Sequence, residues 1–418
     1  MDKIAIIGGG IAGMGCAWLL RDVADVTLFE AGPALGGHVC TIKDGEQPID
    51  TGFIVANDRN YPFFNRFLDE LGIPTQPSDM SFGVSIGAGE IEWAGDSPTK
   101  LFAQPRRAAD AAHWRMIVDI MRFNRQAKRL LESDRCPDIA LGEFLERHRY
   151  SQAFAARYLL PMAAAIWTTP TAGIRHFPLA AFLRFFDNHG LLDVKNRPQW
   201  HTVVGGSHAY VHAVAAILGD RVQTNTPVAR VRRQGQGATV ITERGRTLHF
   251  DRVVFACHAD TTLRLLVDAS DDERAILGAF DFQPNRAVLH SDPRLMPRRR
   301  RVWSSWNYLA DRAEISDQRV AVTYWMNRLQ SIRGPREYFV SLNPLFEPDP
   351  ASVIADISYS HPVFDRGAMA AQTHLDRIQG QGDVWYCGAW CGYGFHEDGL
   401  ASATRVATAL GASAPWQT

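Results

Sequence analysis

The sequence predicts an α/β protein of two domains, and three observations lead to this fold class. An apolar run over residues 3–7 leads through three consecutive glycines into a helical pattern over residues 11–21. A second apolar run over residues 25–30 ends in an acid. The chain has 418 residues, which exceeds the length that one hydrophobic core usually serves. Strand, turn, helix and strand open a Rossmann-like domain, and the remaining length predicts a second, α+β domain.

Charge and composition exclude several classes of function. The formal net charge is −1, from 44 basic and 45 acidic residues, so no overall field favours nucleic acid. No apolar run approaches the roughly 20 residues of a spanning helix, and the N-terminus shows no signal-peptide pattern. We therefore expect a cytoplasmic protein that at most lies peripherally on the inner face of the membrane. The six cysteines are dispersed, which predicts reduced thiols and no metal site.

The first turn carries a dinucleotide-binding pattern. Gly8, Gly10 and Gly13 form G-x-G-x-x-G, in which the first glycine permits a tight turn and the second lets the backbone approach a pyrophosphate. The third glycine allows close packing of helix on strand. The phosphates would rest on the unpaired N–H groups of the first helical turn, at Ile11 and Ala12.

An acid ends the second predicted strand. Glu30 lies where a carboxylate accepts hydrogen bonds from ribose hydroxyls, and we assign it to the same site with its neighbour Ala31. Strand, glycine turn, helix, strand and terminal acid occur in this order. The complete arrangement predicts a bound dinucleotide more strongly than the glycines alone do.

The stretches that follow resemble the FAD-binding opening of a known superfamily. "EAGPALGGHVCTI" carries a second glycine pair after Glu30, and "PIDTGFIV" comes shortly afterwards. Both are similar to the flavin amine oxidase superfamily, which includes carotenoid desaturases and protoporphyrinogen oxidase. The resemblance implies FAD, which we expect to be noncovalent. It assigns to the cofactor Gly36, Gly37, His38, Asp50, Thr51 and Gly52, and His38 stands where the superfamily usually has Arg.

The remainder of the chain follows the same superfamily in order. "RVQTNTPVARVRRQ" predicts a strand around Val228, and "FDRVVFACHA" resembles the strand that closes the FAD domain. "DVWYCGAWCGYGFHEDGLASATRVATAL" resembles the segment that passes the flavin and enters a final helix over residues 400–410, opened by Asp398 and Gly399. The resemblance assigns to the cofactor Val228, Gly388, Asp398, Gly399 and Leu400. Ala389 follows Gly388 where the superfamily often has an acid, so a carboxylate contact from that position is lost.

The predicted FAD-binding domain is discontinuous, over residues 1–75, 200–265 and 370–418. The insertions, 76–199 and 266–369, form the predicted substrate domain. "RVAVTYWM" and "REYFVSLN" in the second insertion predict strands that roof a substrate cavity. The first insertion contains a long amphipathic helix whose apolar stripe is expected to meet the core. That stripe comprises Trp114, Ile117, Ile120 and Met121.

Four stretches bear on the substrate: "YWMNRLQ", "FVSLNP", "SHPVFD" and "CGAWCGYGFHEDGLASA". They resemble flavoproteins associated with cyclopropane fatty-acid synthases, a group related to desaturases of methylated fatty acyl chains. The resemblance implies oxidation of a hydrophobic acyl or lipid substrate, and a lipid-modifying synthase as a partner. Amine oxidases typically keep a flavin-facing lysine in the second insertion, whereas this chain has no lysine after residue 195. Amine oxidation, desaturation or isomerisation of an isoprenoid, and a non-catalytic FAD-binding accessory protein stay open as alternatives.

Three residues are candidates for the proton transfer that accompanies hydride removal. Histidine is readily poised for this near pH 7, and His396 aligns with a flavin-facing position of the superfamily. His361, in "SHPVFD", is the second candidate and Glu397 the third. Each also has a structural interpretation, in which it only donates or accepts hydrogen bonds.

Two further groups of residues are compatible with a lipid substrate. Basic residues beside Trp303 and Trp306 suit an anionic membrane surface, or else form a loop that is solvated or paired with acids. These are Arg298, Arg299, Arg300 and Arg301. Aromatic residues in "IWTTPTAGIRHFPLAAFLRFF" line a lipid channel or belong to the core. They are Trp167, Phe177, Phe182, Phe185 and Phe186.

Overall fold

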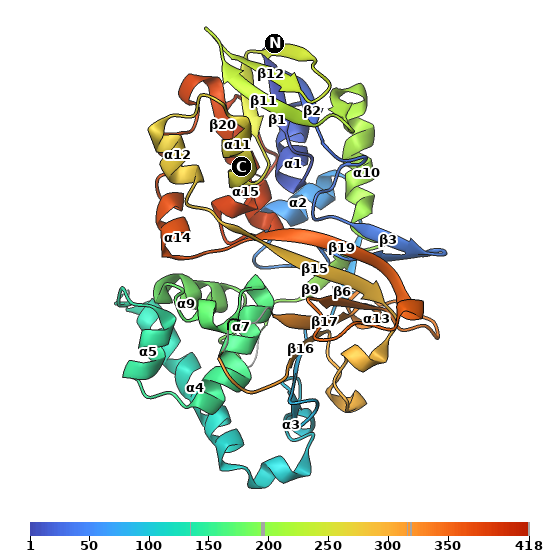
Figure 1. Cartoon of the computed structure of the whole chain (residues 1–418), viewed down its shortest axis with the longest axis vertical. Helices are drawn as coiled ribbons and strands as arrows, with labels where there is room; N and C mark the ends of the chain where they lie inside the picture. Colours follow the sequence, from blue (N-terminus) through green and yellow to red (C-terminus); the bar gives the residue numbers. More distant parts are fainter. Residues whose placement is uncertain (134, 194–196, 316, 318–319, 417–418) are drawn as a thin grey trace.

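The computed structural model describes residues 1–133, 135–193, 197–315, 317 and 320–416. Two bodies stack along the long axis, and the N- and C-termini both lie in the upper one (Figure 1). The upper body is built on a five-stranded parallel sheet with the order β10-β2-β1-β14-β20. Its strands are β1 (Lys3–Ile7), β2 (Asp25–Phe29), β10 (Val222–Gln223), β14 (Arg252–Phe255) and β20 (Val384–Tyr386).

Both faces of this sheet are buried, which explains its continuous apolar runs. Ile4 and Ile6 of β1 pack with the helices on one face, whereas Ala5 and Ile7 pack with those on the other. The first face carries α1 (Ile11–Leu20), α2 (Pro62–Glu70), α10 (His208–Leu218) and α15 (His396–Ala409). The second face carries α11 (Ala259–Leu265), α12 (Asp271–Leu277), α14 (Arg366–Gln372) and the small sheet of β11 (Val228–Arg233), β12 (Ala238–Thr242) and β13 (Thr247–Phe250).

The lower body contains a seven-stranded sheet with the order β19-β15-β18-β17-β16-β7-β8. All its neighbours are antiparallel except β16 and β7. Its strands are β7 (Phe82–Ile86), β8 (Ile91–Ala94), β15 (Phe282–His290), β16 (Trp306–Ala310), β17 (Ala321–Trp325), β18 (Phe339–Leu342) and β19 (Val353–Pro362). β15 and β19 run along the junction with the upper body (Figure 1).

A helical layer lies beside the seven-stranded sheet (Figure 1). It includes α4 (Ala111–Glu132), α5 (Leu141–Arg147), α7 (Leu160–Trp167) and α9 (Leu179–Asn188). Smaller elements connect the bodies: β3 (Thr41–Asp44) with β4 (Gln47–Asp50), and β5 (Ala56–Asn57) with β9 (Trp200–Val203) and β6 (Thr75–Ser78). The predicted α/β class, with a Rossmann-like domain and a second α+β domain, is confirmed. The strands of the two large sheets come from the segments predicted for the two domains, whose boundaries stay predictions.

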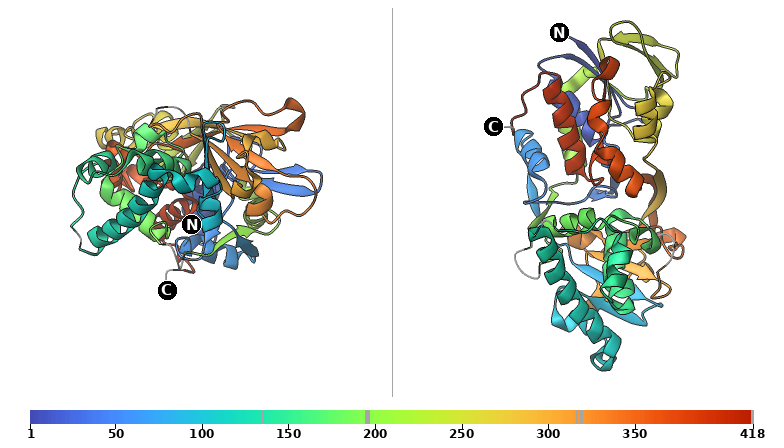
Figure 2. Two further views of the ribbon diagram at one scale, coloured as in Figure 1. Left: turned by 90° about the horizontal axis from the view of Figure 1, so that it is seen from below. Right: turned by 90° about the vertical axis from the view of Figure 1, so that its left-hand side faces the viewer.

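The prediction that the apolar stripe of the long helix α4 meets the core is confirmed for Ile117 and Ile120, which are partly buried against it, and wrong for Trp114 and Met121. Trp114, Val118 and Met121 are 48%, 56% and 50% exposed, respectively, so they face solvent instead of the core. The cause is a buried acid: Asp119 accepts a hydrogen bond from the backbone N–H of Ser151 at 3.0 Å and therefore faces inward. The residues buried along α4 are His113, Met116, Asp119, Phe123 and Ala127. α4 reaches the end of the molecule opposite the N-terminus (Figure 2).

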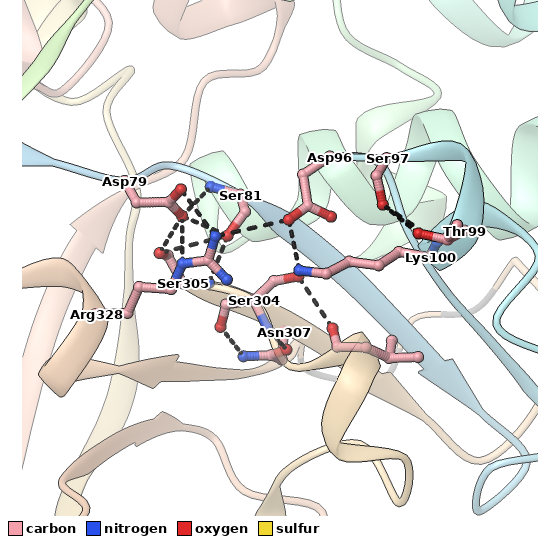
Figure 3. Close-up of polar contacts among 11 residues, drawn as sticks. Asp79, Ser81, Asp96, Ser97, Thr99, Lys100, Ser304, Ser305, Asn307 and Arg328 are labelled. Atoms are coloured by element: carbon pink, nitrogen blue, oxygen red, sulfur yellow. Dashed lines mark hydrogen bonds and ion pairs between the residues drawn. The ribbon is translucent and has the colours of Figure 1, made fainter.

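A polar network holds the start of β16 in place. The carboxylate of Asp79 accepts hydrogen bonds from the hydroxyl groups of Ser81 and Ser305, at 2.5 and 2.7 Å, and pairs with the Arg328 guanidinium at 3.0 Å (Figure 3). The Arg328 guanidinium also lies 3.6 Å from Asp96, which pairs with Lys100 at 2.6 Å. The network thus joins the segment before β7 to the chain that enters β16. No helix within the described ranges is both long and apolar enough to cross a bilayer.

Candidate cofactor site and its surroundings

The N-terminus of α1 forms a cradle for an anion. Gly8 has a φ of +111°, and a Cβ there would lie 2.9 Å from the carbonyl oxygen of Ala256. A Cβ on Gly13 would collide with the carbonyl oxygen of Gly8. Gly10 differs, because a Cβ on it would meet nothing within 4 Å. α1 also has no side-chain cap and no acid in its first turn. The N–H groups of that turn, including those of Ile11 and Ala12, therefore have no capping partner next to the open space at Gly10, which suits a phosphate.

Glu30 lies beside this cradle. Its two carboxylate oxygens accept hydrogen bonds from the backbone N–H groups of Gly9, at 2.8 Å, and Gly32, at 2.7 Å. Each oxygen keeps a further lone pair, so the carboxylate can still accept from a ribose hydroxyl. Ala31 is exposed. The backbone carbonyl of Glu30 accepts from Thr226, which brings the chain leading to Val228 to the same end of β2.

The second glycine pair packs directly on the first turn. The N–H of Gly36 donates to the carbonyl of Gly9 at 2.9 Å. Gly37 has a φ of +59°, and a Cβ on it would lie 3.2 Å from the Cα of Gly10. His38 is the next residue in the chain after Gly37, so its backbone lies beside the phosphate cradle. The open space at Gly10, the uncapped helix and the neighbouring carboxylate fit a bound dinucleotide.

Asp50 is a buried hub that joins three segments. It accepts hydrogen bonds from the hydroxyl of Thr41 at 2.5 Å, from the N–H of Ser207 at 3.0 Å and from the Gln330 amide at 3.0 Å. Burial raises its pKa to about 6, against the opposing effect of these bonds. Thr51 lies 2.8 Å from the hydroxyl of Tyr359. Gly52 approaches His38 so closely that a Cβ would collide with its carbonyl oxygen.

The C-terminal segment meets α1 from the other side. A Cβ on Gly399 would lie 2.9 Å from the side chain of Ile11, and the side chain of Leu400 fills the space left by Gly15. Gly388 donates from its N–H to the Ser402 hydroxyl at 2.9 Å. The final helix was expected to start at residue 400, but α15 begins at His396. The difference arises because Asp398 accepts a hydrogen bond from the N–H of Phe395 at 2.9 Å and thereby caps the preceding turn.

The candidate base His396 lies in an aromatic nest. Its Nε2 is 3.0 Å from the hydroxyl of Tyr210, and its ring also contacts Phe64 edge-on, with 5.8 Å between centroids. The side chain is only 8% exposed, and burial lowers its pKa well below the usual value. At neutral pH the ring is therefore uncharged.

The third catalytic candidate, Glu397, caps a different helix. Its carboxylate oxygens accept hydrogen bonds from the backbone N–H groups of Phe63, at 2.9 Å, and Phe64, at 3.0 Å, in the first turn of α2. The residue at the N-cap of α2, Tyr61, gives no side-chain cap. Burial raises the pKa of Glu397 to about 7. The geometry thus gives Glu397 a structural role; its predicted catalytic role stays a prediction.

The other candidate, His361, belongs to a group of three histidines from distant segments. The centroid of its ring is 5.2 Å from that of His38, and His38 is 6.0 Å from His258, which follows β14. Burial, together with repulsion from His361 and His258, lowers the pKa of His38 to about 3, and burial with repulsion from His258 lowers that of His361 to about 4. No group of three or more His, Cys, Asp or Glu among the described residues could hold a metal ion.

Sequence reasoning missed His258 and the residues that hold His361. His258 follows the apolar run "RVVF", and a side chain just after a parallel strand is a recognisable signal. Thr168 and Asn285, which contact His361, carry no such signal. They lie 193 and 76 residues from His361 in the chain, so only the fold brings them together.

Aromatic rings extend from the predicted flavin segment into the helical layer. Phe395, directly before α15, stacks on Phe185 of α9 with 5.3 Å between centroids. Phe185 contacts Trp167 at the end of α7 at 4.5 Å, and Tyr393 at 5.8 Å. Tyr393 and Phe395, which the sequence analysis did not single out, are half-buried. The five predicted aromatics are all buried in the core: Trp167, Phe177, Phe182, Phe185 and Phe186.

The basic residues at 298–301 are mostly engaged with protein groups. Arg299 pairs with the buried carboxylate of Glu92 at 2.6 Å. Arg300 pairs with Glu337, and Arg301 donates to the carbonyl of Ala103. The fourth, Arg298, is exposed. Trp303 is only 6% exposed and Trp306 is half-buried in β16, which favours the interpretation of this loop as one paired with acids.

Comparison with known proteins decides the family. Residues 11–294, more than half of the chain, match the family described as flavin containing amine oxidoreductase. The chain belongs to this family. The membership confirms the predicted superfamily, its class of flavin-dependent oxidoreductases and FAD as the cofactor. The roles assigned to single residues, and noncovalent attachment, stay predictions.

Relatives in this family differ in the substrates that their names give. A protein of Mycobacterium tuberculosis named as a flavin-containing monoamine oxidase, AofH, is 27% identical over 257 residues, which cover 58% of this chain and 54% of that one. The present chain thus spans little more than half the length of this relative. Two solved structures share the fold: a fatty acid isomerase from P. acnes that produces CLA (TM-score 0.70, 16% identity, covering 98% of this chain and 99% of that one) and a putrescine oxidase variant (TM-score 0.71, 18% identity, covering 98% of each).

Proposed function

We propose that this protein is an FAD-dependent oxidoreductase that oxidises a hydrophobic acyl chain, such as that of a fatty acid or a phospholipid. Bound FAD would supply the acceptor of a hydride equivalent. The observation that carries the proposal is the row of aromatic rings from Phe395 through Phe185 to Trp167. It leads from the predicted flavin segment into an apolar layer, where a chain of methylene groups would be stabilised by about 0.8 kcal/mol for each one buried.

The charge state of the surroundings supports an uncharged reacting group, such as an acyl chain. Burial lowers the pKa values of His38, His189 and His361 to about 3, 4 and 4, respectively, so these three rings are neutral at pH 7. Neither these rings nor any lysine after residue 200 places a full positive charge there. One of the solved structures that share the fold is named as a fatty acid isomerase, which supports a fatty-acyl substrate for this chain.

The test is anaerobic mixing of the flavin-loaded protein with phospholipids that carry unsaturated, methyl-branched or cyclopropane acyl chains. Bleaching of the oxidised flavin band with loss of two hydrogens from an acyl chain, seen by mass spectrometry, is the expected result. Bleaching by amines or isoprenoids, but by no lipid, would overturn the proposed substrate class. Absence of bleaching with all three classes would instead favour a non-catalytic accessory to a lipid-modifying synthase.

We propose further that the protein meets its lipid at an anionic membrane surface, through the exposed face of α4. Trp114, Val118 and Met121 form an apolar stripe along this face. The helix carries five basic residues, Arg115, Arg122, Arg125, Lys128 and Arg129, of which Arg115 and Arg122 pair with Asp119 and Lys128 pairs with Asp193. Apolar insertion flanked by basic side chains suits anionic lipid headgroups. The loop at 298–301 offers less apolar surface, because Trp303 is buried and Trp306 is half-buried.

Cosedimentation with vesicles tests this contact. Vesicles of phosphatidylglycerol should bind the protein more strongly than vesicles of phosphatidylcholine, and the triple variant Trp114→Ser, Val118→Ser, Met121→Ser should lose binding. Ile217→Ser on α10 is the matched control, since Ile217 is 49% exposed on the other body. Equal binding of the triple variant would contradict the proposal. A wild-type dimer that the triple variant abolishes, without vesicle binding, would assign the stripe to a second copy of the chain.

A further inference from the structure

A strained and buried segment supports the ring of His361. Thr168, which ends α7, has a φ of +54° although it is β-branched, a combination that costs free energy in any protein. Its carbonyl accepts a hydrogen bond from the Gln283 side chain at 2.5 Å, and its hydroxyl lies 3.0 Å from Nδ1 of His361. Such backbone strain tends to be kept where it serves a site.

The amide groups around His361 have only one consistent orientation. The backbone N–H of Arg286 donates to Oδ1 of Asn343 at 3.0 Å, which leaves the Asn343 amide nitrogen facing away as a donor. That nitrogen donates to Oδ1 of Asn285 at 2.8 Å. The amide nitrogen of Asn285 must therefore point toward Nδ1 of His361, 3.0 Å away. This series of hydrogen bonds begins at the backbone N–H of Arg286, which can only donate, so the direction of the whole series is fixed.

A donor that faces Nδ1 determines the tautomer of the neutral ring. Nδ1 has to accept, so the single ring proton lies on Nε2. The Thr168 hydroxyl donates to the carbonyl oxygen of Trp167 at 2.7 Å, and its oxygen can accept the second amide hydrogen of Asn285 at 3.3 Å, so it leaves the lone pair of Nδ1 to the Asn285 amide. Among the described residues, no partner is found for Nε2 of His361. Its N–H is thus free to donate to a bound molecule.

His38 carries the complementary group. Its ring hydrogen-bonds the backbone carbonyl of Ser360, while its Nε2 is buried with no partner among the described residues. Because a carbonyl only accepts, the ring proton of His38 lies on Nδ1 and Nε2 keeps a free lone pair. The two rings have centroids 5.2 Å apart. Together they offer one hydrogen-bond donor, Nε2–H of His361, and one acceptor, Nε2 of His38.

We propose that Asn285 is a positioning residue that fixes His361 as an Nε2–H donor, so that His361 holds a bound acceptor group by a hydrogen bond and does not act as a general base. The proposal rests on the proposed function only for the identity of the bound molecule. It replaces the expected role of His361 in proton removal. Thr168 and Asn343 support the same arrangement from either side.

Nitrogen NMR of protein labelled with ¹⁵N in its histidine side chains tests this tautomer without substrate. The wild-type His361 spectrum, assigned by its loss in His361→Gln, should show a protonated Nε2 and an unprotonated Nδ1. His290 is an internal reference, since the backbone N–H of Asp292 donates to its Nδ1 at 3.0 Å and requires the same tautomer. A protonated Nδ1 on His361 in the wild type would overturn the proposal, whatever the substrate proves to be.

The variant Asn285→Asp provides a second test, because it replaces the amide donor that faces Nδ1 of His361 by an acceptor. Its carboxylate can only accept, so the His361 proton should move to Nδ1, while the His290 signals stay unchanged. If this variant does not fold, the wild-type spectrum alone still decides the matter. In turnover assays with lipid, His361→Gln should keep measurable activity because its amide nitrogen can donate from nearly the same position. Complete loss of activity in His361→Gln, with flavin retained, would support a base and contradict the donor role.

Discussion

The imidazole ring of His396 lies nearly parallel to the phenyl ring of Phe53, with 3.6 Å between centroids and 13° between planes. His396 opens α15, whereas Phe53 belongs to the loop after β4, so the stack joins the last helix to the segment that carries Asp50 and Thr51. The same ring meets the hydroxyl of Tyr210 from α10. His396 therefore contributes to stability as well as being the first candidate for proton transfer.

His396→Ala should retain flavin, lose turnover and lower the free energy of unfolding by about 2–3 kcal/mol, through a lost stack and an unpaired buried hydroxyl. Tyr210→Phe is the matched variant, because it removes only the hydrogen bond and should cost about 1 kcal/mol. Thermal unfolding, flavin absorbance and turnover on the same preparations separate the effects. Normal turnover by a flavin-loaded His396→Ala protein would remove this ring from the chemistry.

Glu397→Gln should change how stability depends on pH. Burial raises the pKa of Glu397 in the folded state to about 7, from an ordinary value of 4.5. The folded state then binds more protons than the unfolded state between these values, so the wild type loses stability as pH rises from about 4.5 to 7. The glutamine variant should lack this slope, and it should lose about 1 kcal/mol because its amide oxygen caps only part of α2.

The exposed Glu70 at the other end of α2 offers the control for this experiment. Glu70→Gln should keep the wild-type slope in urea titrations at several pH values. An unchanged slope in Glu397→Gln would show that its carboxylate is ionised as easily in the folded protein as in the unfolded chain.

Local patterns predicted the opening of the fold well, whereas long-range polar contacts escaped them. β1, α1 and β2 follow from apolar runs and glycines that act within a few residues. Glu397 and Asp50 were assigned to the site because of their place in motifs. Their hydrogen-bond partners lie as far as 334 and 280 residues away in the chain. Sequence spacing therefore could not predict that Glu397 caps α2 or that Asp50 joins distant segments.

The error in α4 has a related cause. Its hydrophobic residues could be grouped into a stripe that includes Trp114 and Met121, and apolar stripes usually face the core. The helix instead turns toward Ser151 and buries Asp119, because two arginines and a backbone N–H compensate that carboxylate. A buried acid that is paired with two arginines is an exception to the rule that charged residues lie outside. The positions of Arg115 and Arg122 in the sequence do not predict that both pair with Asp119.

Asp79→Asn should lower stability at pH 7 by about 1 kcal/mol, since Asp79 and Arg328 are partly exposed and water screens their attraction. Burial opposes ionisation of Asp79, but hydrogen bonds from Ser81 and Ser305 and the Arg328 charge prevail and lower its pKa. Its stabilising effect is present above the unfolded-state pKa of about 4 and is lost as pH falls through the lower folded-state value. The difference between wild type and variant should therefore shrink in acid.

Asp22→Asn is the control for the acid experiment, because the side chain of Asp22 is 76% exposed. It should unfold like the wild type at each pH. A difference between Asp79→Asn and the wild type that stays constant down to pH 2 would show that the charge of Asp79 is not what stabilises the start of β16.

Gly10→Val and Gly13→Ala should separate cofactor binding from folding. A Cβ on Gly10 would meet nothing within 4 Å, and the φ of −74° suits any residue. Valine there should therefore leave the unfolding temperature of the apoprotein unchanged while it blocks the phosphate cradle. Loss of charge-assisted hydrogen bonds worth about 1.5–3 kcal/mol corresponds to roughly a tenfold or greater rise in the Kd for FAD. Gly13→Ala instead drives a methyl group into the Gly8 carbonyl and should destabilise the fold itself. If Gly10→Val is purified with wild-type flavin content, the cofactor phosphates do not rest on the N-terminus of α1.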